Sequence, residues 1–142
     1  MKVVLASKNR HKLEEISKIT EKFGFELVLQ SELGVDIDVE ETGTTFEENS
    51  LLKAKAVMEA SGMPAIADDS GLCVDALGGA PGIYSARYAG EPCDHARNNE
   101  KILAALTGKV GAERAAAFVS VIACCHPDGS YFTVRGECRG EM

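Results

Sequence analysis

The sequence predicts an α/β protein with a mixed, twisted β-sheet and flanking helices. Near the N-terminus, an apolar run at 2–6 precedes a helical pattern at 10–23 and a second apolar run at 25–30. This strand–helix–strand order is typical of α/β proteins. Toward the other end, long apolar-rich runs at 115–125 and 131–136 flank a turn sequence and predict a hairpin. Because a hairpin pairs its strands antiparallel, a mixed sheet is favoured over a purely parallel dinucleotide-binding sheet.

The first helix is predicted by apolar residues that recur at steps of three and four positions: Leu13, Ile16, Ile19 and Phe23. Ser7 or Asn9 suits the N-cap position, because a short polar side chain can accept hydrogen bonds from the first helical turn. Gly24 suits the C-terminal end, where glycine adopts a left-handed conformation without strain.

A second helix is predicted from Phe46 to about Ser61. Thr45 and Glu48 have capping-box spacing at its start, and Gly62 and Pro64 follow its end. The segment 33–39 alternates apolar and acidic residues, which predicts a short strand before this helix. The other expected elements are a strand or strand pair over 65–76, a glycine-rich loop at 77–82 and a helix over 96–106.

Composition excludes some function classes. The chain has 142 residues, suits one domain and is 45% hydrophobic, which is enough to bury a core. Its net charge of -7 argues against non-specific nucleic-acid binding and against a basic membrane-binding face. The five cysteines are odd in number and show no CxxC spacing, and no secretory signal precedes them. We therefore expect a reduced, cytoplasmic protein and interpret Cys124-Cys125-His126 as part of a buried strand rather than a metal site.

The segment ASKNRHK, residues 6–12, joins a strand end to the start of a helix. Amide groups at a helix N-terminus favour anions, and Lys8, Arg10 and Lys12 add positive charge to an otherwise acidic chain. A phosphate site is therefore one interpretation. Ordinary cations on a solvated first turn are the other, and spacing alone leaves the two even.

Lys53 lies on a helical stripe that mixes polar and apolar residues: Phe46, Asn49, Lys53, Val57 and Ala60. Lysine is rarely buried without a partner, so Asn49 and Lys53 are expected to face a cleft that also holds acidic or other anionic groups. The alternative is a lysine that extends to solvent at the rim of the core. Glu40 and Glu41 precede this helix, where a carboxylate could reach another strand end.

Asp68 and Asp69 stand together in the run IADDSGL, residues 66–72. Neighbouring side chains on a strand point to opposite faces, so these carboxylates need not face each other. Carboxylates at a strand end suit Mg²⁺ bound with a phosphate substrate. The alternatives are an aspartate that caps a turn at Gly71 and a salt bridge to Lys53, and spacing alone favours the turn.

Taken together, three stretches resemble the inosine triphosphate pyrophosphatase family: VVLASKNRHK, EETGTTFEENSLLKAKA and PAIADDSGLCVDALGGAPGIYSARYAG. They follow the family's order and spacing, and the resemblance covers essentially the whole chain. It implies two lobes around an active-site cleft, Mg²⁺ as cofactor and homodimeric assembly. It also implies hydrolysis of non-standard purine nucleoside triphosphates (ITP, dITP and XTP) to the monophosphate and pyrophosphate, which removes them from the nucleotide pool.

The resemblance also implies residue roles. Asp69 is similar to a metal ligand and proton acceptor, Glu41 to a metal-binding carboxylate and Lys53 to a phosphate-contacting lysine. Asp68 would support the metal site. Substrate binding is implied for Ser70 and for the segment that holds the triphosphate: Ser7, Lys8, Asn9, Arg10, His11 and Lys12. Lys8 stands where the family usually has glycine, so its bulk could crowd a phosphate or its charge could bind one.

The chain stops earlier than is usual in this family. We therefore expect residues 1–142 to form a single, C-terminally short pyrophosphatase domain, without the later segments that shape the base pocket. One alternative is a nucleotide-binding form with impaired catalysis. Another is a fragment that is stable only by association with a second copy.

Overall fold

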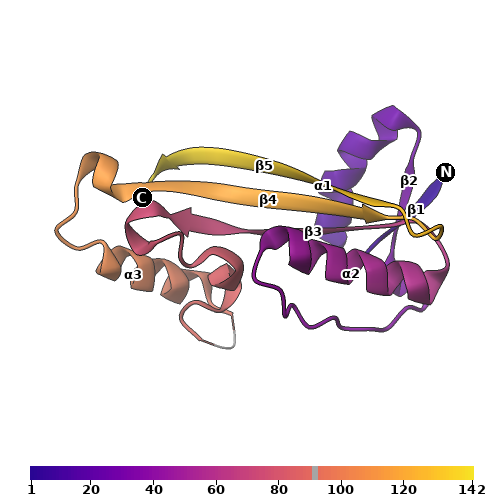
Figure 1. Ribbon diagram of the computed structural model, residues 1–142, viewed down its shortest axis with the longest axis horizontal. Helices are drawn as coiled ribbons and strands as arrows, with labels where there is room; N and C mark the ends of the chain where they lie inside the picture. Colours follow the sequence, from indigo (N-terminus) through magenta and orange to yellow (C-terminus); the bar gives the residue numbers. More distant parts are fainter. Residues whose placement is uncertain (91–92) are drawn as a thin grey trace. The chain divides into compact units, whose positions relative to one another are not determined.

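The computed structural model describes residues 1–90 and 93–142 and divides the chain into two compact units. Unit 1 comprises Met1–Asp68 and Val121–Val134, and unit 2 comprises Asp69–Ser120 and Arg135–Met142. Three long strands, β3 (Ala65–Val74), β4 (Ala115–Cys125) and β5 (Tyr131–Glu141), contribute residues to both units (Figure 1).

The strands form a five-stranded sheet in the order β2-β1-β3-β4-β5. The two short strands are β1 (Lys2–Leu5) and β2 (Glu26–Leu29). β1 pairs parallel with both β2 and β3, whereas a tight turn at 126–130 joins β4 to β5 as a hairpin. The sheet is therefore mixed, as the sequence predicts.

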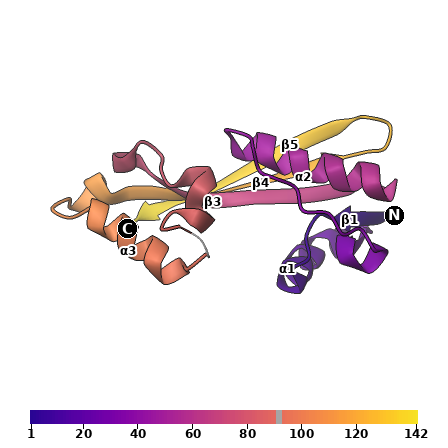
Figure 2. The ribbon, with the colours of Figure 1, turned by 90° about the horizontal axis from the view of Figure 1, so that it is seen from below.

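Two helices cover opposite faces of the sheet in unit 1: α1 (Arg10–Thr20) and α2 (Phe46–Ser61) (Figure 2). Val57 of α2 packs with Val4 and Ala65 in a buried cluster. On the other face, Ile16 and Ile19 of α1 line an apolar cavity of about 250 Å³ together with Val3 and Ile66. The alternation of Val3 and Val4 along β1 thus supplies apolar side chains to both helices.

The start and end of α2 follow from its capping residues. The Thr45 hydroxyl accepts a hydrogen bond from the Glu48 amide at 3.1 Å, and the Glu48 carboxylate accepts one from the Thr44 amide at 2.7 Å. At the other end Gly62 has a φ of 70° and donates its amide to the Met58 carbonyl at 2.8 Å. The predicted bounds, Phe46 and Ser61, are therefore confirmed.

Unit 2 has its own core, built from Leu72, Val74, Ile102, Leu106 and Ala116. Its helix α3 (His95–Ala105) begins after Asp94, whose side chain accepts from the Arg97 amide. Gly71 on β3 lies against the Gly82 carbonyl, and an added Cβ would collide with it. The remaining helical turns are short 3₁₀ segments: Glu21–Phe23, Gln30–Leu33, Asp75–Leu77, Gly82–Arg87 and Gly111–Arg114.

The predicted strand at 33–39 is wrong. Leu33 ends a 3₁₀ turn, and residues 34–45 form neither helix nor strand. The buried Gln30 side chain explains this, because its amide donates to the Val35 carbonyl at 3.1 Å and to the Ile37 carbonyl at 3.0 Å. These bonds satisfy carbonyls that a sheet neighbour would otherwise pair.

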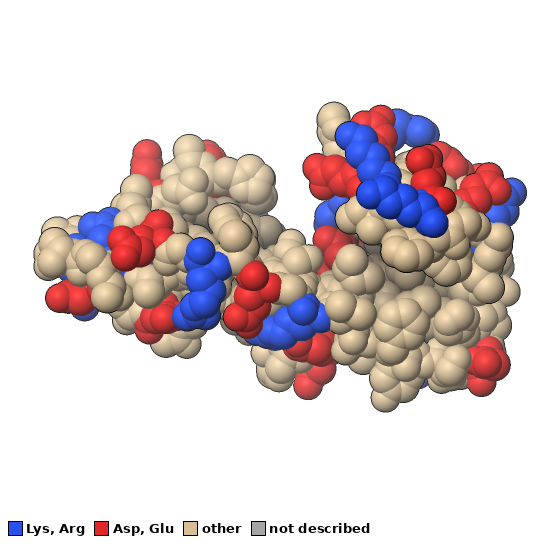
Figure 3. All heavy atoms as spheres, turned by 90° about the horizontal axis from the view of Figure 1, so that it is seen from above, with Lys and Arg blue, Asp and Glu red and all other residues tan. Residues whose placement is uncertain are grey.

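Two further expectations differ in extent. The segment 65–76 is a single continuous strand over Ala65–Val74, and β5 runs to Glu141 rather than ending near 136. No helix among the described residues is long and apolar enough to cross a membrane. On the face drawn in Figure 3, acidic and basic side chains are interspersed rather than gathered into a broad basic area.

The cap of α2 generates a stability prediction. Thr45→Ala removes the hydroxyl that accepts from the Glu48 amide, so the free energy of unfolding should fall by about 1 kcal/mol. Urea unfolding followed by circular dichroism measures this change. Thr45→Ser is the matched control, because it keeps the hydroxyl and should retain most of the stability; equal losses in the two variants would contradict the capping role.

Candidate active site

The segment between β1 and α1 is shaped by its own polar side chains. The Asn9 side chain accepts from the amides of His11 at 2.9 Å and Lys12 at 3.4 Å, and the Ser7 hydroxyl accepts from the Asn9 amide at 3.0 Å. Of the two expected N-cap residues, Asn9 is therefore the one used. Lys8, Arg10 and His11 are exposed beyond this turn.

A cavity of about 260 Å³ in unit 1 lies beside this segment. It brings together four of the predicted site residues: Ser7 and Lys8 from the turn, Glu41 from the connection before α2, and Lys53 from α2. Lys8 and Lys53 are the two cations among the described lining residues, and Asp38 and Glu41 are the two anions. The cavity is small and strongly charged for its size.

Lys53 has partners, as the helical stripe predicts. Its ammonium group lies 3.1 Å from the Glu41 carboxylate and also donates to the main-chain oxygen of Asp68, and its side chain is 17% exposed. Asn49 serves a different purpose, because it is buried and accepts from the Gly43 amide at 2.8 Å. Lys53 thus lines the cavity, whereas Asn49 fixes the connection that carries Glu41.

The two adjacent aspartates have separate environments. They lie within the continuous strand β3, so the favoured turn interpretation is wrong. The Asp68 carboxylate lies 3.0 Å from the Lys12 ammonium, so its salt bridge is to Lys12, whereas Lys53 uses its main-chain oxygen. Asp69 points to the opposite face of β3 and is 7% exposed. Asp69 and the exposed Ser70 belong to unit 2.

The cations of the N-terminal segment also pair with carboxylates. The Lys8 ammonium donates to Asp36 at 2.8 Å and to Asp38 at 3.3 Å, and Arg10 pairs with Glu32 at 3.2 Å. The hydrogen bond from Lys8 lowers the pKa of Asp36, and the same bond raises the pKa of Lys8. The sequence pattern does not indicate this contact, because the alternation at 33–39 predicts a strand rather than a connection that turns Asp36 and Asp38 toward Lys8.

The side chains near the cavity include donors that suit a metal ion. Among the described residues, no group of three or more histidine, cysteine, aspartate or glutamate side chains is arranged to hold a metal ion. Mg²⁺ commonly uses only one or two protein carboxylates together with substrate phosphates, so Glu41 and Asp69 are chemically suitable donors. Cys124 and Cys125 are buried in β4, as expected, and burial raises the pKa of both thiols.

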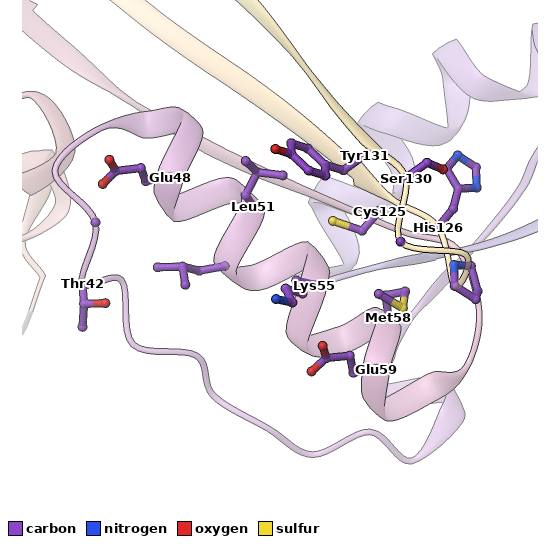
Figure 4. Close-up of a pocket in the computed structure, with 14 residues that line it drawn as sticks. Thr42, Glu48, Leu51, Lys55, Met58, Glu59, Cys125, His126, Ser130 and Tyr131 are labelled. Carbon is purple, nitrogen blue, oxygen red and sulfur yellow. The ribbon is translucent and has the colours of Figure 1, made fainter.

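A larger groove, of about 800 Å³, lies elsewhere in unit 1 (Figure 4). Leu51 and Met58 of α2 line one side, and Cys125 and Tyr131 line the other. The predicted site residues are not among its lining residues, and its lining is mainly apolar. The smaller charged cavity is therefore the better candidate for phosphate chemistry, despite its size.

Comparison with known proteins identifies the family. The model of the Ham1 family matches residues 3–142. The chain belongs to the Ham1 family. The dITP/XTP pyrophosphatase of Haemophilus influenzae is 52% identical over 98% of this chain and 72% of that protein. The dITP/XTP pyrophosphatase of Desulforamulus reducens is 46% identical over 99% of this chain and 70% of that protein.

Solved structures agree on the fold. The HAM1 protein of Coxiella burnetii superposes with a TM-score of 0.91 at 38% identity, over 99% of this chain and 72% of that one. The Ham1 protein of Staphylococcus aureus gives 0.89 at 45% identity, over 99% and 71%. The predicted α/β class is confirmed. This Ham1 chain spans about 70% of the length of these relatives.

The role of Gln30 leads to a second stability prediction. Gln30→Met keeps the length of the buried side chain but removes the donor to the Val35 and Ile37 carbonyls. The free energy of unfolding should fall by about 1–3 kcal/mol, because these groups lose their partner. Urea unfolding of Gln30→Met and of the neighbouring exposed control Ser31→Ala measures this. Wild-type stability in Gln30→Met would show that the side-chain bonds do not hold the connection.

Proposed function

We propose that this chain is a nucleoside triphosphate pyrophosphatase that hydrolyses non-standard purine nucleotides, ITP, dITP and XTP, to the monophosphate and pyrophosphate. The observation that carries the proposal is its 52% identity, over 141 residues, to a protein named dITP/XTP pyrophosphatase. Removal of these nucleotides from the cytoplasmic pool and homodimeric assembly belong to the same proposal, and both rest on the family resemblance.

The charged cavity supports a site for the triphosphate. Lys53 is positioned by Glu41 and by the Asp68 main chain, and Lys8 lines the same cavity. We assign further substrate contacts to Ser7, Asn9, Arg10, His11, Lys12 and Ser70. The ion pair between Asp68 and Lys12, at 3.0 Å, orients the Lys12 ammonium group at the N-terminal turn of α1. Fixed ammonium groups suit a polyanion, because they need little rearrangement when it binds.

Glu41 and Asp69 would hold Mg²⁺ together with substrate phosphates, in keeping with the preference of this ion for carboxylate and phosphate oxygens. When bound, Mg²⁺ supplies positive charge that offsets the charge of the triphosphate. Both side chains are carboxylates, and Asp69 is largely shielded from solvent at 7% exposure.

The reaction breaks the anhydride bond between the α- and β-phosphates, as the two products require. We assign Asp69 as the base that orients a water molecule and accepts its proton while the water oxygen attacks the α-phosphorus. Lys53 stabilises the negative charge that develops on the phosphoryl oxygens. The bonding electrons leave with the β-phosphate oxygen, and pyrophosphate departs.

The products provide a direct test. Incubation with ITP and Mg²⁺ should release pyrophosphate and inosine monophosphate in equal amounts, and EDTA should stop the reaction. Phosphorus-31 NMR distinguishes pyrophosphate from orthophosphate. Orthophosphate as the initial product would contradict the proposal, and calorimetric binding of ITP without turnover would favour the alternative of a nucleotide-binding form with impaired catalysis.

The assigned base gives a second test of this function. Asp69→Asn keeps the size of the side chain but removes its basicity, so kcat should fall by about 10²–10⁴-fold. Asp75→Asn is the matched control: Asp75 is an exposed carboxylate of unit 2 that pairs with Arg139. Wild-type kcat in Asp69→Asn would remove Asp69 from the mechanism, provided that thermal unfolding shows both variants to be folded.

A further inference from the structure

Two exposed aspartates contact a cation of the charged cavity and have no role in the mechanism above. The Lys8 ammonium lies 2.8 Å from Asp36 and 3.3 Å from Asp38. The Lys8 side chain is 42% exposed, and those of Asp36 and Asp38 are 91% and 94% exposed. Lys8 therefore already has anionic partners in the protein, at the mouth of the cavity where phosphate is proposed to bind.

Both aspartates belong to the connection 34–45, which also carries Glu41. Among the residues that the structure describes, two cations line the cavity, Lys8 and Lys53. The connection supplies carboxylates to both, because Asp36 and Asp38 pair with Lys8 and Glu41 pairs with Lys53. The positive charges of Lys8 and Lys53 are thus offset by carboxylates from a single segment of the chain. An incoming polyanion would meet cations that already have partners.

The connection holds these carboxylates in place through its backbone. Gln30 binds the Val35 and Ile37 carbonyls at one end, and Asn49 binds the Gly43 amide at the other. Val35 is buried, and Ile37 packs against the cluster that contains Val57. Asp36 and Asp38 are exposed whereas Val35 is buried and Ile37 is half-buried, so the two aspartates lie on the same side of the connection, where both contact Lys8.

The two contacts to Lys8 are of the kind that an anion displaces easily. Ion pairs between exposed side chains contribute little to stability, because water and salt compete for both charges. A phosphate chain offers several charged oxygens at once and forms stronger, charge-assisted hydrogen bonds. Replacing the aspartates by phosphate at Lys8 is therefore favourable. The free energy needed to break the two ion pairs nevertheless makes phosphate binding weaker than it would be without the aspartates.

We propose that Asp36 and Asp38 are positioning residues that set the affinity for the phosphate chain through Lys8. They hold its ammonium group at the mouth of the cavity until the phosphate chain replaces them. This role rests on the proposed function, because the phosphate chain is that of the proposed nucleoside triphosphate substrate. The lysine at position 8 thereby also has a role: its charge binds phosphate, and the two carboxylates moderate that binding.

Inorganic tripolyphosphate tests this exchange without any need for turnover. Its Kd is measured by calorimetry at 0.15 M salt for wild type, Lys8→Met, Asp36→Asn/Asp38→Asn and the triple variant. The double variant should bind about three- to tenfold more tightly, because the competing carboxylates are gone. Lys8→Met should bind more weakly, and the two Asp→Asn changes should tighten binding by a smaller factor in the Lys8→Met background, because the part of their effect that acts through Lys8 is gone.

Glu21→Gln/Glu26→Gln is the matched control. It changes the net charge by the same amount, but at exposed positions beyond the C-terminal end of α1. The length of α1 puts that end about 16 Å from the start of the helix, which is more than the distance over which salt screens exposed charges. Its affinity should equal that of wild type. The inference is overturned if wild type does not bind tripolyphosphate, if the double variant binds more weakly, or if Lys8→Met or the control shows the same tightening.

Kinetics separates this inference from the proposed function. With ITP, the double variant should lower KM with kcat unchanged, whereas a merely structural role would change kcat or thermal stability. The four tripolyphosphate Kd values form a mutant cycle. If this cycle gives the expected affinities and ITP is not cleaved, the proposed activity is wrong and the exchange at Lys8 stands. If ITP is cleaved and the cycle shows no coupling through Lys8, the exchange is wrong and the activity stands.

Discussion

The arrangement of the charged cavity depends on one largely buried ammonium group. Lys53 reaches from α2 to the Glu41 carboxylate and to the main-chain oxygen of Asp68 on β3. A lysine so poorly exposed needs such partners, because removing an ammonium group from water is costly unless its hydrogen bonds are replaced. The pairing therefore ties α2, the connection 34–45 and β3 to one another at the cavity.

The same principle explains how an acidic chain accommodates a cluster of cations. With a net charge of -7, the protein has ample carboxylates, and the cations of the N-terminal segment each contact at least one. Lys12 pairs with Asp68, Arg10 with Glu32, and Lys8 with two aspartates. These pairs hold the cationic groups in place, and their carboxylates offset the positive charge, as expected in a chain with a net negative charge.

Features that depend on neighbouring residues were predictable. The bounds of α2 follow from Thr45 and Gly62, which act within a few residues of their own positions. The absence of a strand at 33–39 could not be predicted from this segment, because a buried side chain outside it, Gln30, takes the carbonyl groups on which a strand would depend. The turn favoured for Asp68 and Asp69 failed for a related reason: pairing within the sheet extends β3 through both residues.

The sequence by itself determined the α/β class, the bounds of α2, the family and the residue types proposed for catalysis, because each depends on local spacing or on a linear motif. Tertiary structure alone decided which charges meet. It pairs Asp68 with Lys12 rather than Lys53, brings Glu41 to Lys53 and places Asp36 and Asp38 against Lys8. Ion pairs form between residues far apart in the chain, and their partners are set by the path of the backbone between them, which no local pattern encodes.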